Sequence, residues 1–453
     1  MPEKLPFPQQ SVAEPLPHSP SRLTDEERTY RPRWLQFAPF LGRPPALTRR
    51  QWRVLGLVAA ASFFEQYDLY LFALSLKQIQ SGLGIAEAEL GFLGSIVRFG
   101  ALPAFLVALV ADCVGRRQVL LFTILAYTLL TSATAFAPDA RTFVVLQFFA
   151  RTFAVAEALL AVVVIAEEFD PAVRGWGIGA LGAIQSCGAG LAALLFALVG
   201  HVENGWRGLY LVGLGPLLVL AYWRRALPET ERFQELSRQR SEAGETEHLL
   251  RPLVRLFRMY PARIATLASV VFVLAMAEAA AGFFGPKFLQ DAHGWTPKAV
   301  GLMTFFAGGF AIVGNTFAGW LSDRAGRKWV TIAFVCGQVV FTIAYYNGPE
   351  LLVVPIWMLM IFMLLGANVT LAAYGSELFP TSYRSTAAGA RVIVGTVGGS
   401  IGLALESVLY SLLNSHWVAI SILTAFALLA APIVAVTFPE TSGRSLEEIA
   451  PER

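Results

Sequence analysis

The stretch GWLSDRAGRK at residues 319–328 joins two long apolar runs, and ALVADCVGRR at residues 108–117 does the same earlier in the chain. Both stretches place an aspartate, a glycine and two basic residues at the same spacing. Asp323 follows Asp112 by 211 positions, close to half of the 453 residues. A repeat at a fixed offset is the signature of an internal duplication.

Other landmarks keep nearly the same offset. It is 210 residues between Lys77 and Lys287, 209 between Glu168 and Glu377, and 211 between the Pro-Glu-Thr triplets at 228–230 and 439–441. Unrelated features would not share one spacing by chance, so the sequence predicts two halves with the same fold.

The composition predicts that these halves lie in a membrane. The chain is 55% hydrophobic and 15% charged, whereas soluble domains carry roughly 25% charged residues. Its mean hydropathy is +0.57. Apolar runs of about 20 residues recur, the length that crosses roughly 30 Å of hydrocarbon. We therefore expect an all-α membrane protein.

The same composition argues against several other classes of function. A net charge of only +3 argues against a nucleic-acid-binding protein, which would carry a basic patch or stripe. Three scattered cysteines and five scattered histidines match no disulfide or zinc framework. Neither a Walker lysine loop nor a His-Glu-x-x-His helix is present. We expect no enzyme, no cofactor and no metal site.

The hydropathy pattern predicts six apolar spans on either side of a polar linker. A proline-rich tail at 1–50 precedes a first bundle at 51–224, a linker at 225–261, a second bundle at 262–438 and a short tail at 439–453. The expected spans are 52–76, 88–111, 118–137, 142–166, 175–200, 206–224, 263–288, 298–321, 329–347, 351–374, 386–411 and 416–438.

Basic residues indicate the orientation of these spans. They gather in the linker and in the loops after the second and fourth span of each bundle, whereas the opposite loops carry few bases, balanced by acids. The positive-inside rule then places both termini and the linker in the cytoplasm. We expect a multi-pass protein of the cell membrane.

With these features the chain resembles the major facilitator superfamily over residues 50–445. Residues 319–328 match the loop signature of that superfamily almost residue for residue, whereas the first copy has Ala108 in place of glycine and Cys113 in place of a base. The Pro-Glu-Thr endings are similar to those of the sugar-porter and metabolite:proton symporter branches. The resemblance implies twelve transmembrane helices in two pseudo-symmetric six-helix bundles, with a solute site between them.

The loop motifs are candidates for a gate that closes by charge pairing. A carboxylate at a helix end can accept from a neighbouring helix N-terminus or pair with an arginine, and glycine permits a tight turn. We expect Glu168 to find a partner in Arg174, and Glu377 in Arg384. The gating candidates are Asp112, Gly115, Arg116, Glu168, Arg174, Gly319, Asp323, Arg324, Gly326, Arg327, Glu377 and Arg384. The alternative is that these charges only set the topology.

Ionisable residues inside the spans are costly, at about 2.5–3.5 kcal/mol each near a helix centre. Asp68, Arg98 and Arg151 lie at similar depths, about 12–15 Å from the same membrane face at 1.5 Å per residue. They should therefore face one another across the first bundle. One interpretation is a proton-coupled site in which an arginine also meets an anion. The other is a permanent ion pair that only fixes helix packing.

Further polar residues within the spans complete the candidate site. The other proton-coupling candidates are Glu65, Glu157 and Glu278, the last at the duplicated position of Asp68. The substrate-binding candidates besides Arg98 and Arg151 are Tyr67, Gln185, Asn315, Asn368 and Tyr374, each equally compatible with helix packing. Arg391 and Glu406 lie near span ends, where either side chain can reach the interface.

The function expected from these features is secondary active transport by alternating access. We expect symport of a small organic solute with protons, and prefer a carboxylate because Arg98 and Arg151 supply cationic donors. Sugar uptake and proton-driven efflux are alternatives within transport, and a non-transporting membrane sensor or scaffold is one outside it. The expected partners are the solute, protons and the lipid bilayer, without nucleic acid, and we expect a monomer.

The orientation is testable by cysteine labelling in a background without the native cysteines. An impermeant thiol reagent should reach a cysteine at Thr142 only from outside and a cysteine in the linker only from the cytoplasm, because the bases mark the cytoplasmic side. Labelling at Thr142 from the cytoplasmic side alone would reverse the predicted orientation.

Overall fold

The computed structural model describes residues 30–37, 41, 44–201, 205–225, 256–380, 383–444 and 446–450. These residues form helices and turns, as the all-α prediction requires. The tail up to residue 29, most of the predicted linker and the first Pro-Glu-Thr triplet lie outside the described residues.

The first half crosses the bundle in the order that the spans predict. Its elements are η1 (Arg33–Phe37), α2 (Arg49–Leu74), α3 (Leu76–Leu83), η3 (Glu87–Glu89), α4 (Leu90–Phe99), α5 (Pro103–Val114), α6 (Arg116–Thr134), α7 (Ala140–Glu168), α8 (Pro171–Phe196), η4 (Val199–His201), α9 (Trp206–Leu211) and α10 (Leu214–Arg224). The first, second and sixth passages each consist of two successive helices: α2 with α3, α4 with α5, and α9 with α10.

The second half repeats this plan with longer helices. Its elements are α13 (Pro261–Ala292), α14 (Pro297–Ala325), α15 (Arg327–Asn347), η5 (Glu350–Leu352), α16 (Val353–Glu377), α17 (Arg384–Leu413), α18 (His416–Phe426), η7 (Ala427–Leu429), α19 (Ala430–Thr437) and α20 (Leu446–Ile449). Among the described residues, eight helical segments are long and apolar enough to cross a membrane by length and composition alone. Each of the predicted spans coincides with a helical passage, which confirms the expected membrane fold.

Proline explains a break in the second passage, which the hydropathy pattern predicted as continuous. α4 ends at Phe99 and α5 begins with Pro103, whose ring leaves no backbone N–H to continue the helix. The Gly100 carbonyl at this break accepts from Thr152 Oγ1 of α7 at 2.7 Å. The bond ties the end of α4, which carries Arg98, to α7.

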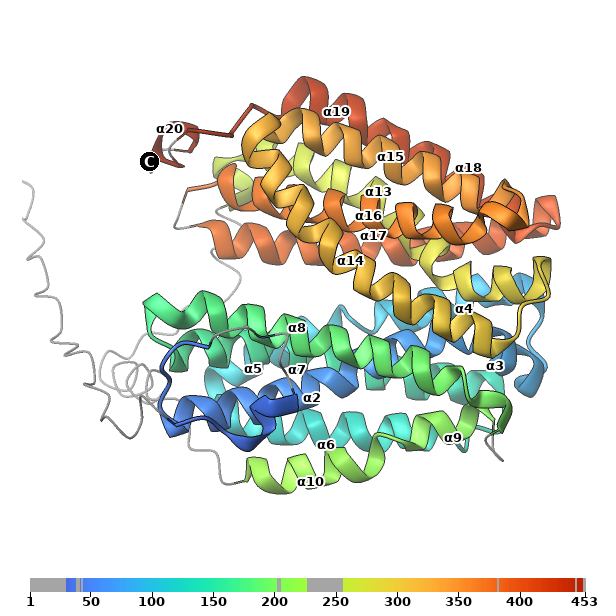
Figure 1. Cartoon of the computed structure of the whole chain (residues 1–453), viewed down its shortest axis with the longest axis horizontal. Coiled ribbons are helices and arrows are strands. Elements are labelled where there is room, and N and C mark those ends of the chain that lie inside the picture. Colours follow the sequence, from blue (N-terminus) through green and yellow to red (C-terminus); the bar gives the residue numbers. More distant parts are fainter. Residues whose placement is uncertain are drawn as a thin grey trace, which may run out of the picture.

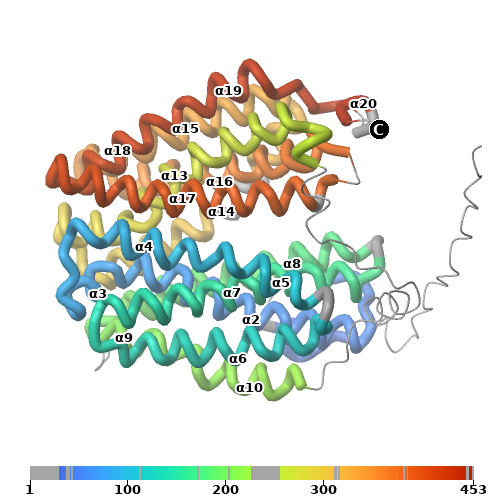
Figure 2. Tube along the Cα trace, turned by 180° about the vertical axis from the view of Figure 1, so that it is seen from behind, coloured from blue at the N-terminus to red at the C-terminus, as the bar shows by residue number. Residues whose placement is uncertain are grey.

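The two halves lie side by side, with the second half above the first in both Figure 1 and the reverse view of Figure 2. They meet chiefly where α4 packs on α17 and α8 on α14. We call the end at which residues 108–117 and 319–328 turn the motif end, and the opposite end the closed end. At the closed end the Phe92 N–H donates to Ser407 Oγ at 3.0 Å. Toward the motif end the ribbons of the halves diverge (Figure 1).

The turns at the motif end have the backbone geometry that their glycines predict. Gly115 has φ 114° and Gly326 has φ 94°, in the region that favours glycine. Beyond Gly326, the Glu440 carboxylate accepts from the backbone N–H groups of Arg327 and Lys328 at 2.8 and 3.1 Å. Burial acts to raise the pKa of Glu440, but these and neighbouring backbone donors outweigh it and hold the pKa below its usual value. The second Pro-Glu-Thr triplet therefore places an anion at the N-terminus of α15.

The first-half gating candidates form a different pair from the one expected. Glu168 pairs with Arg50 at 2.7 Å and not with Arg174, whose Nε has no hydrogen-bond partner among the described residues. The neighbouring Glu167 pairs with Arg116 at 3.1 Å. The first turn of α2 packs beside the end of α7, so it supplies a nearer cation than α8 does.

The second-half candidates also pair within their own half. Glu377 pairs with Arg327 at 2.9 Å, and Arg327 bonds Asp323 at 3.1 Å. Arg384, the expected partner of Glu377, donates instead to the Phe379 carbonyl at 3.3 Å. Of the remaining candidates, Arg324 lies 4.4 Å from the Trp320 ring centroid, the Gly319 carbonyl accepts from Ser322, and the Asp112 side chain lies outside the described residues. None of these described pairs bridges the two halves.

A buried ion pair ties the sixth passage to the rest of the first half. Glu157 of α7 pairs with Arg224 of α10, and both side chains are 1% exposed. Glu157 also accepts from Thr123 Oγ1 of α6 at 2.7 Å, and Arg224 donates to the Leu57 carbonyl of α2 at 3.1 Å. Helices α2, α6, α7 and α10 therefore meet at one buried ion pair.

Removing one partner of this pair should destabilise the fold. Arg224→Ala leaves the Glu157 carboxylate buried without its cation, a change that typically costs about 3–5 kcal/mol. We expect a lower unfolding temperature for the purified protein in detergent, measured by intrinsic fluorescence. The matched control is Arg225→Ala, which removes the exposed neighbour and should leave that temperature unchanged. Equal unfolding temperatures for the two variants would contradict a structural role for the pair.

Candidate functional site

A cavity of about 300 Å³ lies between the two halves. Helices α2, α4, α6 and α7 of the first half and α13 and α17 of the second contribute its lining. Its charged lining residues are Glu65, Asp68, Arg98, Arg151 and Glu278. The volume is at the lower end of the range of about 300–1,000 Å³ that is typical of small-molecule sites. The cavity therefore fits one small solute.

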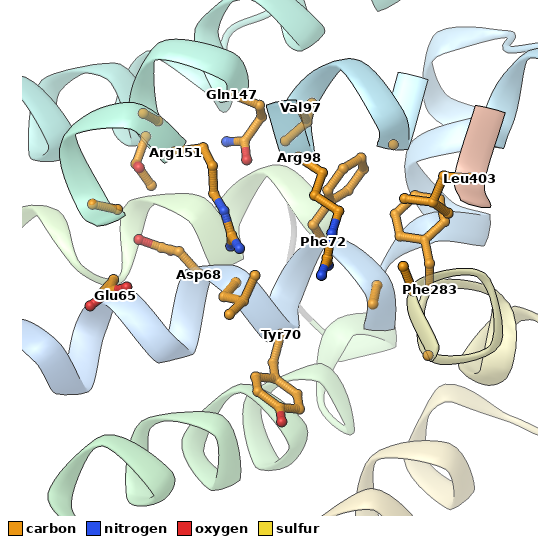
Figure 3. A pocket seen from close by; sticks show the side chains of 18 of the residues that line it. Glu65, Asp68, Tyr70, Phe72, Val97, Arg98, Gln147, Arg151, Phe283 and Leu403 are labelled. Carbon is orange, nitrogen blue, oxygen red and sulfur yellow. The ribbon is translucent and has the colours of Figure 1, made fainter. Parts of the chain in front are cut away.

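Arg98 of α4 and Arg151 of α7 extend from neighbouring helices into this space (Figure 3). No ion pair or hydrogen bond to either side chain occurs within the described part of the chain, and both Nε atoms are buried. Arg98 lies against α17, where a Cβ on Gly399 would collide with its Nε. Two half-buried guanidiniums with no acceptor among the described residues form a site suited to an anion.

The two carboxylates of α2 share a helix face, as their spacing predicts. Asp68 accepts a hydrogen bond from the Tyr127 hydroxyl of α6. The permanent Asp68–Arg151 pair, which the depth match left open, is not formed between these described side chains. Glu65 is close enough to Arg151 to feel its charge, yet its Oε2 has no hydrogen-bond partner among the described residues. The acids therefore lie beside the two arginines without neutralising them by direct contact.

The second half contributes an acid at the duplicated position. Glu278 of α13 accepts from Gln338 Nε2 of α15 at 2.9 Å and from Asn368 Nδ2 of α16 at 3.4 Å. It lies near enough to Arg98 to attract that cation across the interface between the halves. Gln338 follows Tyr127 by 211 positions. The duplication has therefore preserved both the acid and the position of its hydrogen-bond donor.

Aromatic rings form the apolar part of the lining. Tyr70 and Phe72 of α2, Tyr127 of α6 and Phe283 of α13 all border the cavity. Phe72 and Phe283, one from each half, pack edge to face with their centroids 5.0 Å apart. Such rings offer a planar solute both a face and an edge to pack against.

Several predicted site residues lie outside this lining. Tyr67 donates to the Leu209 carbonyl at 2.8 Å, because adjacent residues of a helix point about 100° apart and Tyr67 faces away from Asp68. The others are Tyr374, which donates to the Pro439 carbonyl at 3.1 Å, the half-buried Gln185, Asn368 behind Glu278, and Glu157 in its pair with Arg224. The Asn315 side chain lies outside the described residues.

Sequence reasoning missed several residues that the structure brings to the cavity. Gln147 precedes Arg151 by four positions and lines the same cavity, and this spacing could have identified it. Tyr127 could have been found only by noting that Gln338 occupies the equivalent position in the second half of the duplication. Nothing in the sequence distinguishes Phe72 and Phe283 among the 33 phenylalanines.

Comparisons with curated proteins give transporters that align over most of the chain. The chain is 25% identical to a putative niacin/nicotinamide transporter of Bacillus subtilis, over 90% of this chain and 100% of that protein. It is 26% identical to a cis,cis-muconate transport protein of Acinetobacter baylyi, over 77% of this chain and 86% of that protein.

A solved structure shows the same fold. The D-xylose-proton symporter superposes with a TM-score of 0.72 at 16% identity, over 87% of this chain and 99% of that chain. The family model described as Major Facilitator Superfamily matches residues 58–276 and again residues 267–452, in agreement with the duplication. The chain therefore belongs to the Major Facilitator Superfamily and is a membrane transporter of that family.

Proposed function

We propose that the chain is a proton-coupled symporter of small organic carboxylates, with the anion bound between Arg98 and Arg151. The observation that carries this proposal is the pair of cavity guanidiniums, neither bonded to any described residue. A carboxylate offers two oxygens that match the planar fork of a guanidinium. Niacin and cis,cis-muconate, for which two relatives are named, are planar unsaturated carboxylates that would suit the aromatic lining.

Protons enter the proposed cycle through Asp68, Glu65 and Glu278. An ionised acid in the cavity competes with the solute for the arginines, whereas a protonated acid does not. Proton uptake therefore favours anion binding, and proton release favours anion departure. Because Glu278 is attached to the second half and Arg98 to the first, their distance changes whenever the halves move. This links the charge of the cavity to the conformation.

The orientation of the cycle follows from the positive-inside rule, which places the motif end in the cytoplasm. The structure is then closed toward the outside. In the proposed cycle the paired motifs of the two halves come together when the cavity opens outward, and Asp323 and Glu377 exchange their present partners. Both termini would be cytoplasmic.

Asp68→Asn should uncouple transport from the proton gradient. The introduced amide keeps an oxygen that accepts from Tyr127, so the fold should be preserved while the titrating group is lost. Coupling to one proton concentrates a monocarboxylate about tenfold per unit of imposed pH difference, since a factor of ten corresponds to about 1.4 kcal/mol. We expect this accumulation of labelled nicotinate in proteoliposomes to vanish, while exchange of labelled for unlabelled nicotinate continues.

The matched control for this change is Asp139→Asn at the N-terminus of α7, an exposed site where asparagine also caps the helix. It should accumulate nicotinate normally. Full accumulation by Asp68→Asn would exclude Asp68 as the coupling residue, and Glu65 and Glu278 would become the next candidates.

Arg98→Gln should weaken binding of the acid more than binding of its amide. Losing a charge-assisted hydrogen bond costs about 1.5–3 kcal/mol, which corresponds to roughly 10–150-fold in affinity. Nicotinate affinity should fall by this factor in equilibrium binding to the purified protein, whereas nicotinamide affinity should change little.

Arg141→Gln, at an exposed arginine of α7 outside the cavity, is the control and should bind both ligands as the unchanged protein does. An unaltered preference for nicotinate over nicotinamide in Arg98→Gln would contradict the proposed anion site.

A further inference from the structure

A second group of titratable side chains lies outside the cavity, at the closed end. This closed-end cluster consists of Lys77 and Glu87 from the first half and Lys287, Asp291, Glu406 and His416 from the second. Lys77 pairs with Asp291 at 2.7 Å, and Lys287 pairs with Glu87 at 3.1 Å. Each of these ion pairs joins the two halves, so the cluster forms only while this end is shut.

His416 lies between two carboxylates of this cluster. Its Nδ1 is 2.5 Å from Glu406 Oε1, and its Nε2 is 3.0 Å from Glu87 Oε2. Glu406 belongs to α17, in the same half as His416, whereas Glu87 belongs to η3 of the other half. The imidazole therefore bridges the halves with one ring nitrogen on each carboxylate.

Counting protons shows that this bridge holds one more than a neutral imidazole and two ionised carboxylates supply. A neutral imidazole has a proton on one ring nitrogen only, and an ionised carboxylate has none. Two hydrogen bonds between these three groups require two protons. The second proton resides either on His416 or on one of the two carboxyl groups, and in both cases the bridge has bound one proton from solvent.

The charges of the whole cluster agree with this count. Lys77 and Lys287 contribute two positive charges, and Glu87, Asp291 and Glu406 contribute three negative charges. With the additional proton the cluster is neutral, and without it the cluster carries an uncompensated negative charge. Phe284 and Tyr410 stack against the His416 ring with centroids at 4.6 and 4.0 Å, an arrangement that favours a cationic ring.

We propose that Glu87, His416 and Glu406 form a proton-binding site, separate from the transport cavity, that holds the closed end shut while its additional proton is bound. When the halves separate, Glu87 leaves with the first half. One proton on His416 then suffices for the remaining bond to Glu406, and the other returns to solvent. Glu87 is 41% exposed, whereas Glu406 is fully buried, so the proton enters and leaves at the Glu87 side.

Among the described residues, His416 is the only group that can carry a positive charge in contact with Glu406. The titratable and charged side chains that face it or its carboxylates are Glu406 and Tyr410 of α17, Lys287 and Asp291 of α13, Glu87 of η3, Lys77 of α3 and Tyr346 of α15. Both lysines are bonded to Asp291, and neither contacts Glu406. Among these described groups, the buried Glu406 carboxyl is therefore held by the proton that it shares with His416 and by no lysine.

The proposal is testable by the accessibility of the cavity from the closed-end side. Ala73, which lines the cavity, is replaced by cysteine in full-length protein whose Cys113, Cys187 and Cys336 are changed to serine. An impermeant maleimide is added to the side that the closed end faces, between about pH 5 and pH 8, where histidines exchange protons. Rates are normalised to a cysteine at Ser81, which is exposed on α3.

In protein with the cluster unchanged, labelling of the cysteine at Ala73 should become faster as the pH rises. Opening that releases one proton shifts its equilibrium by up to about tenfold per pH unit. This readout uses no solute, so it can fail or succeed independently of the proposed carboxylate transport.

Two substitutions should remove this pH dependence in opposite directions. In His416→Gln both N–H donors are on one nitrogen, which cannot occupy the Nδ1 and the Nε2 position together, and the amide does not titrate. Labelling should therefore be fast at every pH. In Glu87→Gln, neutral His416 donates from Nδ1 to Glu406 and accepts at Nε2 from the introduced amide, so both bonds form without an additional proton. Labelling of Glu87→Gln should therefore be slow at every pH.

His293→Gln is the matched control, because His293 lies at the end of α13, where its ring packs on Phe288 outside the cluster. It should keep the pH profile of the unchanged protein. The proposal is overturned if the unchanged protein shows no pH dependence, or if Glu87→Gln keeps the full dependence. The result for Glu87→Gln decides the proposal even if His416→Gln does not fold.

Discussion

A guanidinium inside an apolar helical bundle must be bonded or reach water, because burying an unpaired charge is costly. The chain meets this requirement in two different ways. Arg224 is bonded to Glu157 and to the Leu57 carbonyl, and four helices meet at this pair. Arg98 and Arg151 instead extend into a cavity, with no bond to any described side chain. This contrast within one bundle distinguishes a structural ion pair from a candidate binding site. In the proposed complex, the carboxylate of the solute supplies the acceptors that Arg98 and Arg151 lack.

The duplication preserved one acid of the cavity but not its cations. Asp68 and Glu278 occupy equivalent positions and accept from equivalent positions on α6 and α15. The positions 211 residues after Arg98 and Arg151 are Gly309 and Phe362. The first half therefore holds both arginines of the proposed anion site, while the second contributes an acid and the Phe283 ring. A site divided in this way changes its electrostatics when one half moves against the other, which is what coupling by alternating access requires.

Sequence reasoning predicted the fold and the charged lining well, because both depend on periodicity and depth. The lengths of the apolar runs predicted the helical passages. The similar depths of Asp68, Arg98 and Arg151 predicted that these side chains face one another, and all three line one cavity. Sequence reasoning did not predict the bonding partners of the charged residues: Glu168 forms an ion pair with Arg50, and Asp68 accepts a hydrogen bond from Tyr127. Spacing along one helix gives a depth and a face, but it does not say which other helix packs there. The bond between His416 and Glu87 spans 329 residues, and no local pattern predicts it.

Joint entry of carboxylates and protons can be measured as a proton flux. Purified protein is reconstituted into proteoliposomes that enclose a pH-sensitive dye, and solute is added outside without an imposed pH difference. Nicotinate or cis,cis-muconate should acidify the lumen at a rate that saturates with solute concentration and is absent from protein-free liposomes. Nicotinamide and xylose should not. Uptake of labelled carboxylate without acidification, or equal acidification by xylose, would rule out a proton symporter that is specific for carboxylates.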